Sequence, residues 1–190
     1  MRLKDKVAIV TGAANGIGAE ISRTFAREGC HVVLADLDEG KAAALAEEIM
    51  KETGVRTVAV GCDVAQKEAL QRVVDTCVAE FGTVDILVNN AGITLPACPV
   101  EDITPERWRK VLDIDLMGTI YGTQCVIPVM KAHKSGKIIN MASVAGQVGG
   151  VFTEATYPVS KAGVICWAKA VAKQVGEYNI TCNCIAPGTI

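Results

Sequence analysis

The amino-acid sequence predicts an α/β fold in three layers, with one doubly wound parallel sheet between two layers of helices. Short continuous runs of Val, Ile and Ala alternate along the chain with longer stretches that carry apolar residues at helical spacing. Such apolar runs are typical of parallel strands that are buried on both faces. A length of 190 residues, with 50% apolar and 21% charged residues, suits one globular domain with a sizeable core.

The elements follow in order along the chain. Apolar runs predict strands at Lys6–Thr11, His31–Asp36, Arg56–Val60, Val84–Val88, Lys137–Met141 and Ile180–Ile185. Helical spacing predicts helices at Gly16–Glu28, Gly40–Lys51, Gln66–Glu80, Pro105–His133 and Thr156–Glu177, with a first-turn proline opening the fourth. Helices between the strands imply right-handed crossovers and a parallel sheet. No repeat, low-complexity tract or linker interrupts this order, so we expect a single domain over residues 1–190.

Charge and the beginning of the chain limit the classes of partner. The net charge is −2 and no block of like charges occurs, which gives nucleic acid or an anionic membrane little to bind. Residues 1–6 lack the apolar segment of a signal peptide, and no apolar run approaches membrane-spanning length. We therefore expect a cytoplasmic protein with neither nucleic acid nor a membrane as its partner.

The cysteines do not form a metal-binding pattern. Only Cys182 and Cys184 lie close together, on one face of a predicted strand, and no second pair completes a zinc site. We expect buried free thiols and no metal at positions 30, 62, 77, 98, 125, 166, 182 and 184.

A glycine-rich turn, Thr11-Gly-Ala-Ala-Asn-Gly-Ile-Gly18, joins the first strand to the first helix. Glycines in this place let the backbone approach a pyrophosphate, which then binds at the helix N-terminus. The spacing is GxxxGxG, which differs from the GxGxxG of the common dinucleotide fingerprint. Such turns also close ordinary βα units, so the turn alone is a weak signal. The expected cofactor contacts here are Gly12, Asn15, Gly16, Ile17 and Gly18.

An acidic residue, Asp36, ends the second strand. A carboxylate at this position can accept hydrogen bonds from both hydroxyls of an adenosine ribose and would repel a 2′-phosphate. Leu37 follows, and the loop contains no Arg or Lys, so we expect NAD rather than NADP. The alternative is that Asp36 caps the next helix.

Tyr157 and Lys161 are four residues apart and therefore lie on one face of the last helix. A free phenol has a pKa of about 10, so acting as a base near neutrality requires roughly 4 kcal/mol of help. An ammonium about 4–5 Å away supplies about that much. The alternative is an ordinary pair on a helix surface, because Tyr and Lys fall at this spacing often.

Together these residues resemble the short-chain dehydrogenase/reductase family, from about Lys4 to the last residue. The motifs that carry the resemblance are TGAANGIG, Asp36, Asp63-Val64, Asn89-Asn90-Ala91-Gly92, Ser143, Tyr157 with Lys161, and Pro187-Gly188. The GxxxGxG spacing and the NNAG sequence resemble the family's single-domain branch. The resemblance implies a Rossmann-type NAD-binding domain. In it Asp63 and Val64 flank the adenine, and Asn89 joins strands. Further expected cofactor contacts are Asn90, Ala91, Gly92, Tyr157, Lys161, Pro187, Gly188 and Ile190.

The resemblance also implies a reaction, the interconversion of a secondary alcohol and a ketone by hydride transfer. Tyr157 takes the hydroxyl proton, Ser143 orients the substrate oxygen, and Lys161 lowers the phenol pKa and binds the nicotinamide ribose. One alternative is a 3-oxoacyl-thioester reductase, with Lys131, Lys134 and Lys137 facing an acidic carrier protein. Another is an NAD-binding module without turnover.

The chain departs from the family pattern in two places. Asp115 stands where the family has a catalytic asparagine, whose position holds a water of a proton relay. We expect that relay to survive, with an added negative charge facing Lys161. The alternative is that Asp115 points elsewhere or is protonated by burial. The sequence also ends shortly after Pro187-Gly188, whereas family members continue with a lid and a seventh strand, so we expect an incomplete C-terminus.

The visible pocket walls and the outer helices give two more expectations. Ile93–Cys98 and Val144–Thr156 should form apolar walls, with Ile93, Leu95, Val148, Val151 and Phe152 as apolar members and Gln147 and Glu154 as polar ones. By resemblance, the two long helices pair in a homodimer or homotetramer. Their apolar residues are Trp108, Leu112, Met117, Tyr121, Val164, Trp167 and Val171.

Overall fold

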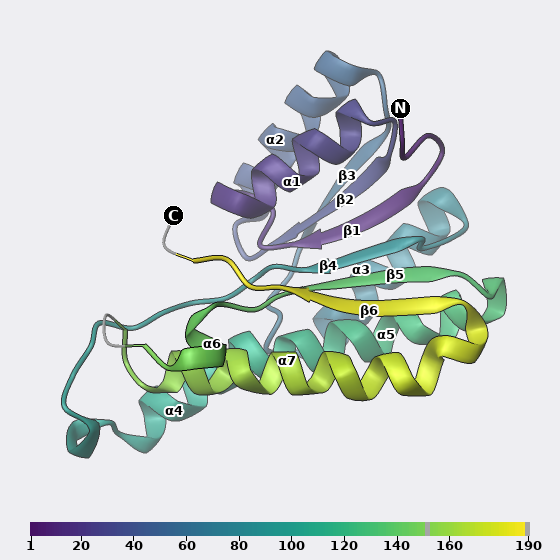
Figure 1. Ribbon diagram of the computed structural model, residues 1–190. Coiled ribbons are helices and arrows are strands. Elements are labelled where there is room, and N and C mark those ends of the chain that lie inside the picture. The colour runs from purple at the N-terminus through teal and green to yellow at the C-terminus, as the bar shows by residue number, and fades with distance from the viewer. Residues whose placement is uncertain (151–152, 189–190) are drawn as a thin grey trace.

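The structure of the protein, a computed structural model, describes residues 1–150 and 153–188, and its centre is a six-stranded parallel sheet (Figure 1). The order in the sheet is β3-β2-β1-β4-β5-β6, and every pair is parallel. The strands are β1 Val7–Thr11, β2 His31–Asp36, β3 Thr57–Gly61, β4 Ile86–Asn89, β5 Gly136–Met141 and β6 Ile180–Ile185. The predicted doubly wound sheet is therefore confirmed, with strand ends within two residues of the expected ones.

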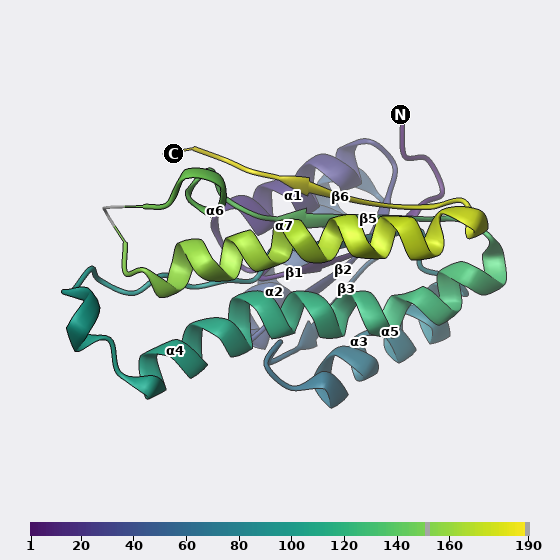
Figure 2. The same ribbon diagram turned by 60° about the horizontal axis from the view of Figure 1, so that its bottom comes forward.

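Helices cover the sheet on both sides, as Figures 1 and 2 show. One side carries α1 Gly16–Arg27 and α2 Glu39–Thr53, and the other carries α3 Lys67–Phe81, α5 Gly118–His133 and α7 Thr156–Val175. Each side has its own apolar cluster. β1 and β4 are buried along their whole length because helices lie on both of their faces, which explains why they are apolar up to their last residues, Thr11 and Asn89. Nowhere in residues 1–150 and 153–188 is a helix both long and apolar enough to cross a bilayer.

The predicted single helix Pro105–His133 is wrong in one respect, since it consists of three segments. α4 Pro105–Val111 and α5 are joined by a π-helical turn over Leu112–Met117. Asp115 lies within this turn, where its side chain accepts a hydrogen bond from the Ile93 backbone N–H at 2.8 Å. π-helical turns of this kind occur frequently at functional sites. Three short helices were not predicted, namely Val100–Asp102, α6 Ala145–Val148 and Gly176–Tyr178.

The apolar residues that were expected on the outside of the long helices divide into two groups. Val164 and Val171 are buried in the core of the protein. The other members remain half-buried, namely Trp108, Leu112, Met117, Tyr121 and Trp167. The apolar surface left for a second copy of the chain is therefore smaller than the sequence indicated.

The topology places a crevice between β1 and β4. The chain crosses from β3 at one edge back to β4 beside β1, so the loops after β1 and β4 diverge above their carboxyl ends. Ligands of doubly wound proteins bind at such a switch point. Asn89 ends β4 beneath this crevice, and its amide donates to Asn140 Oδ1 at 2.8 Å and to the Thr119 carbonyl at 3.3 Å. The expectation that Asn89 joins strands is confirmed.

Candidate active site and cofactor cleft

The glycine-rich turn is folded tightly against the loop after β4. Gly12 and Gly16 have φ values of 62° and 52°, a left-handed conformation that favours glycine. A Cβ on Gly18 would lie 2.1 Å from the Gly12 carbonyl oxygen, so only glycine lets the helix start this close to the turn. The Asn90 side chain donates to the carbonyls of Thr11 at 2.9 Å and Gly12 at 3.0 Å. These contacts fix the turn at the N-terminus of α1.

Asp36 lies beside the same turn. Its carboxylate accepts hydrogen bonds from the backbone N–H groups of Ala14 at 2.8 Å and Asp38 at 3.0 Å. The residue that caps α2 is Asp38, which accepts from the Lys41 N–H at 3.1 Å. The alternative that Asp36 caps this helix is therefore wrong. Lys41 pairs with Asp38 at 2.8 Å and so belongs to the cap.

A cavity of about 470 Å³ opens between the turn, Asp36 and the loops after β3 and β4. Eleven of the residues expected to contact the cofactor line it, namely Gly12, Asn15, Gly16, Ile17, Asp36, Leu37, Asp63, Val64, Asn90, Ala91 and Gly92. Gly18 lies behind the turn and does not line it. Sequence reasoning missed Cys62 and Ile114 as lining residues, although Cys62 immediately precedes Asp63.

A second cavity, of about 290 Å³, continues the first along the carboxyl ends of the strands. Both contain Ile17, Asn90, Gly92 and Ile93 in their walls. The second adds the predicted Ser143, Tyr157, Lys161, Pro187 and Gly188, Thr94 from the predicted wall Ile93–Cys98, and two residues that were not predicted, Met141 and Ala142. The expected contact Ile190 lies outside the described residues.

A third and larger cavity, of about 990 Å³, follows on the other side of Tyr157. It has Thr94, Ser143, Tyr157 and Gly188 in common with the second cavity. Its remaining described walls are apolar or small, apart from Thr153, and are formed by Val144, Ala145, Val148, Gly149 and Gly150. The three cavities form one row, because each has lining residues in common with the next, and Tyr157 lines both the second and the third.

The predicted pocket walls are only partly correct. Of the predicted members, Ile93 lines the first two cavities and Val148 lines the third. Gln147 is exposed, and Glu154 is buried away from the cavity, which removes both expected polar members. Leu95 does not line a cavity among the described residues, and the expected wall residues Val151 and Phe152 lie outside them.

Tyr157 and Lys161 begin α7, beside the carboxyl end of β5. Lys161 is only 4% exposed, so the alternative of a helix-surface pair is wrong. Its Nζ donates to the Met141 carbonyl at 3.0 Å and lies 5.6 Å from the centre of the Tyr157 ring. Ser143 follows the end of β5, and its hydroxyl accepts from the Ala145 N–H at 3.1 Å, at the start of α6. A phenol, an ammonium and a hydroxyl thus converge on one cavity.

Asp115 stands behind Lys161 rather than in the cleft. Its side chain is fully buried, and Oδ2 lies 3.6 Å from Lys161 Nζ and 3.2 Å from the Ser160 hydroxyl. Burial raises the pKa of the Asp115 carboxyl, and the Lys161 charge and the donors Ile93 N–H and Ser160 O–H oppose that rise. The Asp115 side chain thus faces Lys161, as expected, and it carries a negative charge at pH values where its carboxyl is ionised.

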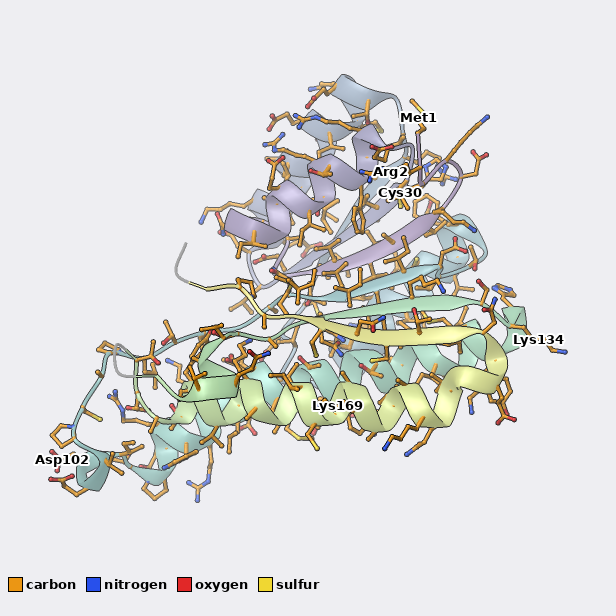
Figure 3. All side chains as sticks on the ribbon, viewed as in Figure 1. Met1, Arg2, Cys30, Asp102, Lys134 and Lys169 are labelled. Carbon is orange, nitrogen blue, oxygen red and sulfur yellow. The ribbon has the colours of Figure 1, made fainter. Side chains whose placement is uncertain are left out.

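Cys62 lines the first cavity, but neither the cysteines nor the predicted basic patch is part of the second cavity. All eight cysteines are free, but only five are buried, while Cys98 and Cys184 are half-buried and Cys166 is exposed. Lys131 and Lys134 lie at the end of α5, and Lys137 lies at the start of β5. All three are at the amino ends of the strands, whereas the cleft is at the carboxyl ends. Figure 3 shows Lys134 at the far end of the molecule from Asp102, which belongs to the segment after β4.

The fold and the row of cavities define a Rossmann-type protein with a cleft at the carboxyl ends of its strands. The sequence matches the family described as short chain dehydrogenase over residues 6–190. The chain belongs to this short-chain dehydrogenase family.

Three relatives illustrate the similarity. The trans-4-hydroxycyclohexanecarboxylate dehydrogenase of Sinomonas cyclohexanicum is 43% identical, over 100% of this chain and 74% of that protein. The 3-oxoacyl-[acyl-carrier-protein] reductase of Chlamydia muridarum is 37% identical, over 99% of this chain and 75% of that protein. The crystal structure of an NAD⁺-bound xylitol dehydrogenase superposes with a TM-score of 0.94 and 34% identity, covering 99% of this chain and 72% of that one.

Proposed function

We propose that the protein is an NAD-dependent oxidoreductase that interconverts a secondary alcohol and a ketone. The observation that carries this proposal is the convergence of Ser143, Tyr157 and Lys161 on one cavity, which continues into the cavity that contains Asp36. Membership of the short-chain dehydrogenase family supports it, as do the dehydrogenases among the relatives.

The residues of the first cavity fit a dinucleotide. The glycine-rich turn leaves backbone space at the N-terminus of α1, where anions bind well, and Asp36 offers carboxylate oxygens to a ribose. The NAD⁺-bound xylitol dehydrogenase among the structural neighbours supports this choice of cofactor. When bound, NAD supplies the hydride acceptor for alcohol oxidation.

The side chains of the second cavity divide the remaining work. Tyr157 takes the proton of the substrate hydroxyl at its phenolate oxygen during oxidation and returns it during reduction. Ser143 donates a hydrogen bond to the substrate oxygen and holds it beside the phenol. Lys161 stabilises the phenolate through its positive charge, which water screens little because the side chain is buried.

The third cavity is the site proposed for the rest of the substrate. None of its described lining residues is charged, and its only polar side chains are those of Thr94, Ser143, Thr153 and Tyr157. Such a lining favours a neutral alcohol with an apolar body. Cyclohexanol is therefore a suitable first probe.

A 3-oxoacyl-thioester reductase is the second candidate, and the relative from Chlamydia muridarum favours it. Lys131, Lys134 and Lys137 do not support it, because β5 has six residues and separates them from the cleft by roughly 20 Å. Carrier binding by these lysines would leave the thioester at the wrong end of the sheet.

The test is NADH formation with cyclohexanol, trans-4-hydroxycyclohexanecarboxylate and xylitol, beside reduction of a 3-oxoacyl thioester with NADH. Oxidation of the alcohols supports the proposal, and thioester reduction alone supports the second candidate. Replacing Tyr157 by Phe should lower kcat by roughly 10²–10⁴-fold and leave NAD binding unchanged. NAD binding without turnover of any substrate would instead identify a binding module.

A further inference from the structure

A buried carboxylate lies three residues before Tyr157 and has no part in the chemistry proposed above. Glu154 is 1% exposed, and its carboxylate accepts hydrogen bonds from the Arg107 guanidinium, from Cys98 Sγ at 3.3 Å and from the Thr156 hydroxyl at 2.8 Å. Burial raises the pKa of Glu154, but the donors outweigh it and hold that pKa below the usual range. The carboxylate is therefore ionised and paired with Arg107 at neutral pH.

Arg107, in the first turn of α4, connects two segments that are far apart in the sequence. Its Nε binds Glu154, and its Nη2 donates to the Pro96 carbonyl at 3.0 Å. Pro96 also forms an antiparallel bridge with Thr153, and the Glu154 N–H donates to the Leu95 carbonyl at 3.4 Å. The segment after β4 is thereby attached to the segment before α7, and Figure 2 shows both at the same end of the molecule.

These two segments form facing walls of the proposed substrate site. Thr94 comes from the first segment and Thr153 from the second, and Tyr157 follows in α7. Arg107 and Glu154 are absent from the cavity lining and support both walls from behind.

Stability alone is a weak reason for this ion pair. The Glu154 side chain is fully buried and the Arg107 side chain is 34% exposed, so the carboxylate loses its hydration, and such a pair is often no more stabilising than an apolar pair of similar volume. Its planar guanidinium does fix one geometry, since two of its nitrogens have separate acceptors. A role in fixing the position of the two segments therefore explains the pair better than a role in stability.

We propose that Arg107 and Glu154 are positioning residues that hold the Thr94 wall against the Tyr157 helix and so set the affinity for the alcohol or ketone. This inference rests on the proposed function, because it concerns the substrate of that reaction. Cofactor affinity should not depend on the pair, since neither residue lines the first cavity.

Three variants separate charge from geometry. Glu154→Gln removes the charge but keeps the shape and an oxygen for Thr156. Arg107→Lys keeps the charge but provides no second nitrogen in the fixed geometry that reaches Pro96. Arg107→Leu removes both the positive charge and the nitrogen that reaches Pro96. The control is Arg56→Leu, which removes an Arg–Glu pair of similar form with Glu80, at 2.8 Å, beside the amino end of β3.

For each alcohol that the unmodified protein oxidises, KM should rise about tenfold or more in Glu154→Gln and Arg107→Leu. It should rise less in Arg107→Lys and stay unchanged in Arg56→Leu. The value of kcat and the Kd for NAD should change little. An unchanged KM, or a parallel loss of NAD affinity and kcat, would overturn the inference, because a general loosening of the fold produces that pattern.

Hydrogen exchange provides a test that does not need turnover. The Glu154 and Tyr157 N–H groups donate to Leu95 and Glu154 carbonyls, so their exchange should accelerate in Glu154→Gln and Arg107→Leu but not in Arg56→Leu. If the unmodified protein binds NAD but oxidises no alcohol, the proposed function fails, and exchange still decides whether the pair holds the walls. Unchanged exchange in both variants would overturn that role.

Discussion

Replacing Asp115 by Asn tests the electrostatic cost of the carboxylate behind Lys161. An asparagine keeps the shape of the side chain and an oxygen that can accept from the Ile93 N–H. It removes the negative charge that lies 3.6 Å from Lys161 Nζ and places an amide NH2 group where Oδ2 accepts from the Ser160 hydroxyl. The substitution therefore changes the field at the active site, keeps the contact with Ile93 and changes the one with Ser160.

The distances give the size of the effect. With an effective dielectric constant near 20, Lys161 at 5.6 Å from the centre of the Tyr157 ring stabilises a phenolate by about 3 kcal/mol. Lys161 Nζ lies 3.6 Å from Asp115 Oδ2 and 5.6 Å from the centre of the Tyr157 ring, so the carboxylate lies within about 9 Å of that ring. At this distance the carboxylate charge destabilises a phenolate by roughly 2 kcal/mol. An ionised Asp115 thus offsets more than half of the free energy by which the Lys161 charge stabilises a phenolate.

The expected result is a pH–rate profile for alcohol oxidation that moves about one pH unit lower in Asp115→Asn. The sign follows because removal of a negative charge stabilises the negatively charged form of the site, which is the form that takes the alcohol proton. Because burial raises the pKa of Asp115, the shift is largest at pH values where this carboxyl is ionised. The profile is measured at saturating NAD and alcohol.

Asp113→Asn is the matched control, because Asp113 is exposed in the same π-helical turn. Its profile should coincide with that of the unmodified protein. Superimposable profiles for Asp115→Asn, or an equal shift in both variants, would refute the electrostatic argument.

Three other predictions concern the cofactor, the packing of the site and assembly. The affinity for NAD should exceed that for NADP by about tenfold or more, and Asp36→Ser should reduce this difference. Equal affinities in the unmodified protein would contradict the role of Asp36. Gly92→Ala should lower kcat about tenfold or more, since its Cβ would lie 3.1 Å from Lys161 Nζ and 3.3 Å from Asp115 Oδ1. Gly176→Ala, which meets nothing within 4 Å, is the control, and equal kcat values would reject the explanation. Light scattering should give a dimer or tetramer, and a clean monomer would exclude this assembly.

The sheet could be predicted because burial on both faces leaves a direct mark on the sequence. β1, Val-Ala-Ile-Val-Thr, is buried at all five positions, and so only an unbroken apolar run is stable there. The π-helical turn could not be predicted in the same way. It lies within an unbroken helical pattern, and one of its residues bonds to the Ile93 N–H, a contact that appears only when the chain is folded. α6, with four residues, is too short to show a helical period.

The site divides along similar lines. The proximity of Tyr157 and Lys161 followed from a helical spacing, which is local, whereas the place of Ser143 beside them came from the resemblance to the family. The Arg107–Glu154 pair was missed because its members are 47 residues apart in the sequence. Glu154 lies within a predicted pocket wall, so its charge indicated a polar residue of the cavity lining. Glu154 is buried instead because three donors from different segments meet it. The catalytic and cofactor roles, the single domain, the cytoplasmic location and the assembly stay predictions.

The π-helical turn has a consequence for changes in chain length. α4 and α5 form one continuous rod, and each residue advances an α-helix by about 100° of rotation. A π-helical turn winds less per residue than an α-helix, so it holds about one extra residue without rotating the segments on either side of it. Deletion of one residue within Leu112–Met117, with a return to ordinary winding, would therefore leave Arg107 on the side of the rod that faces Glu154. The same deletion would remove the turn that holds Asp115 against the Ile93 N–H.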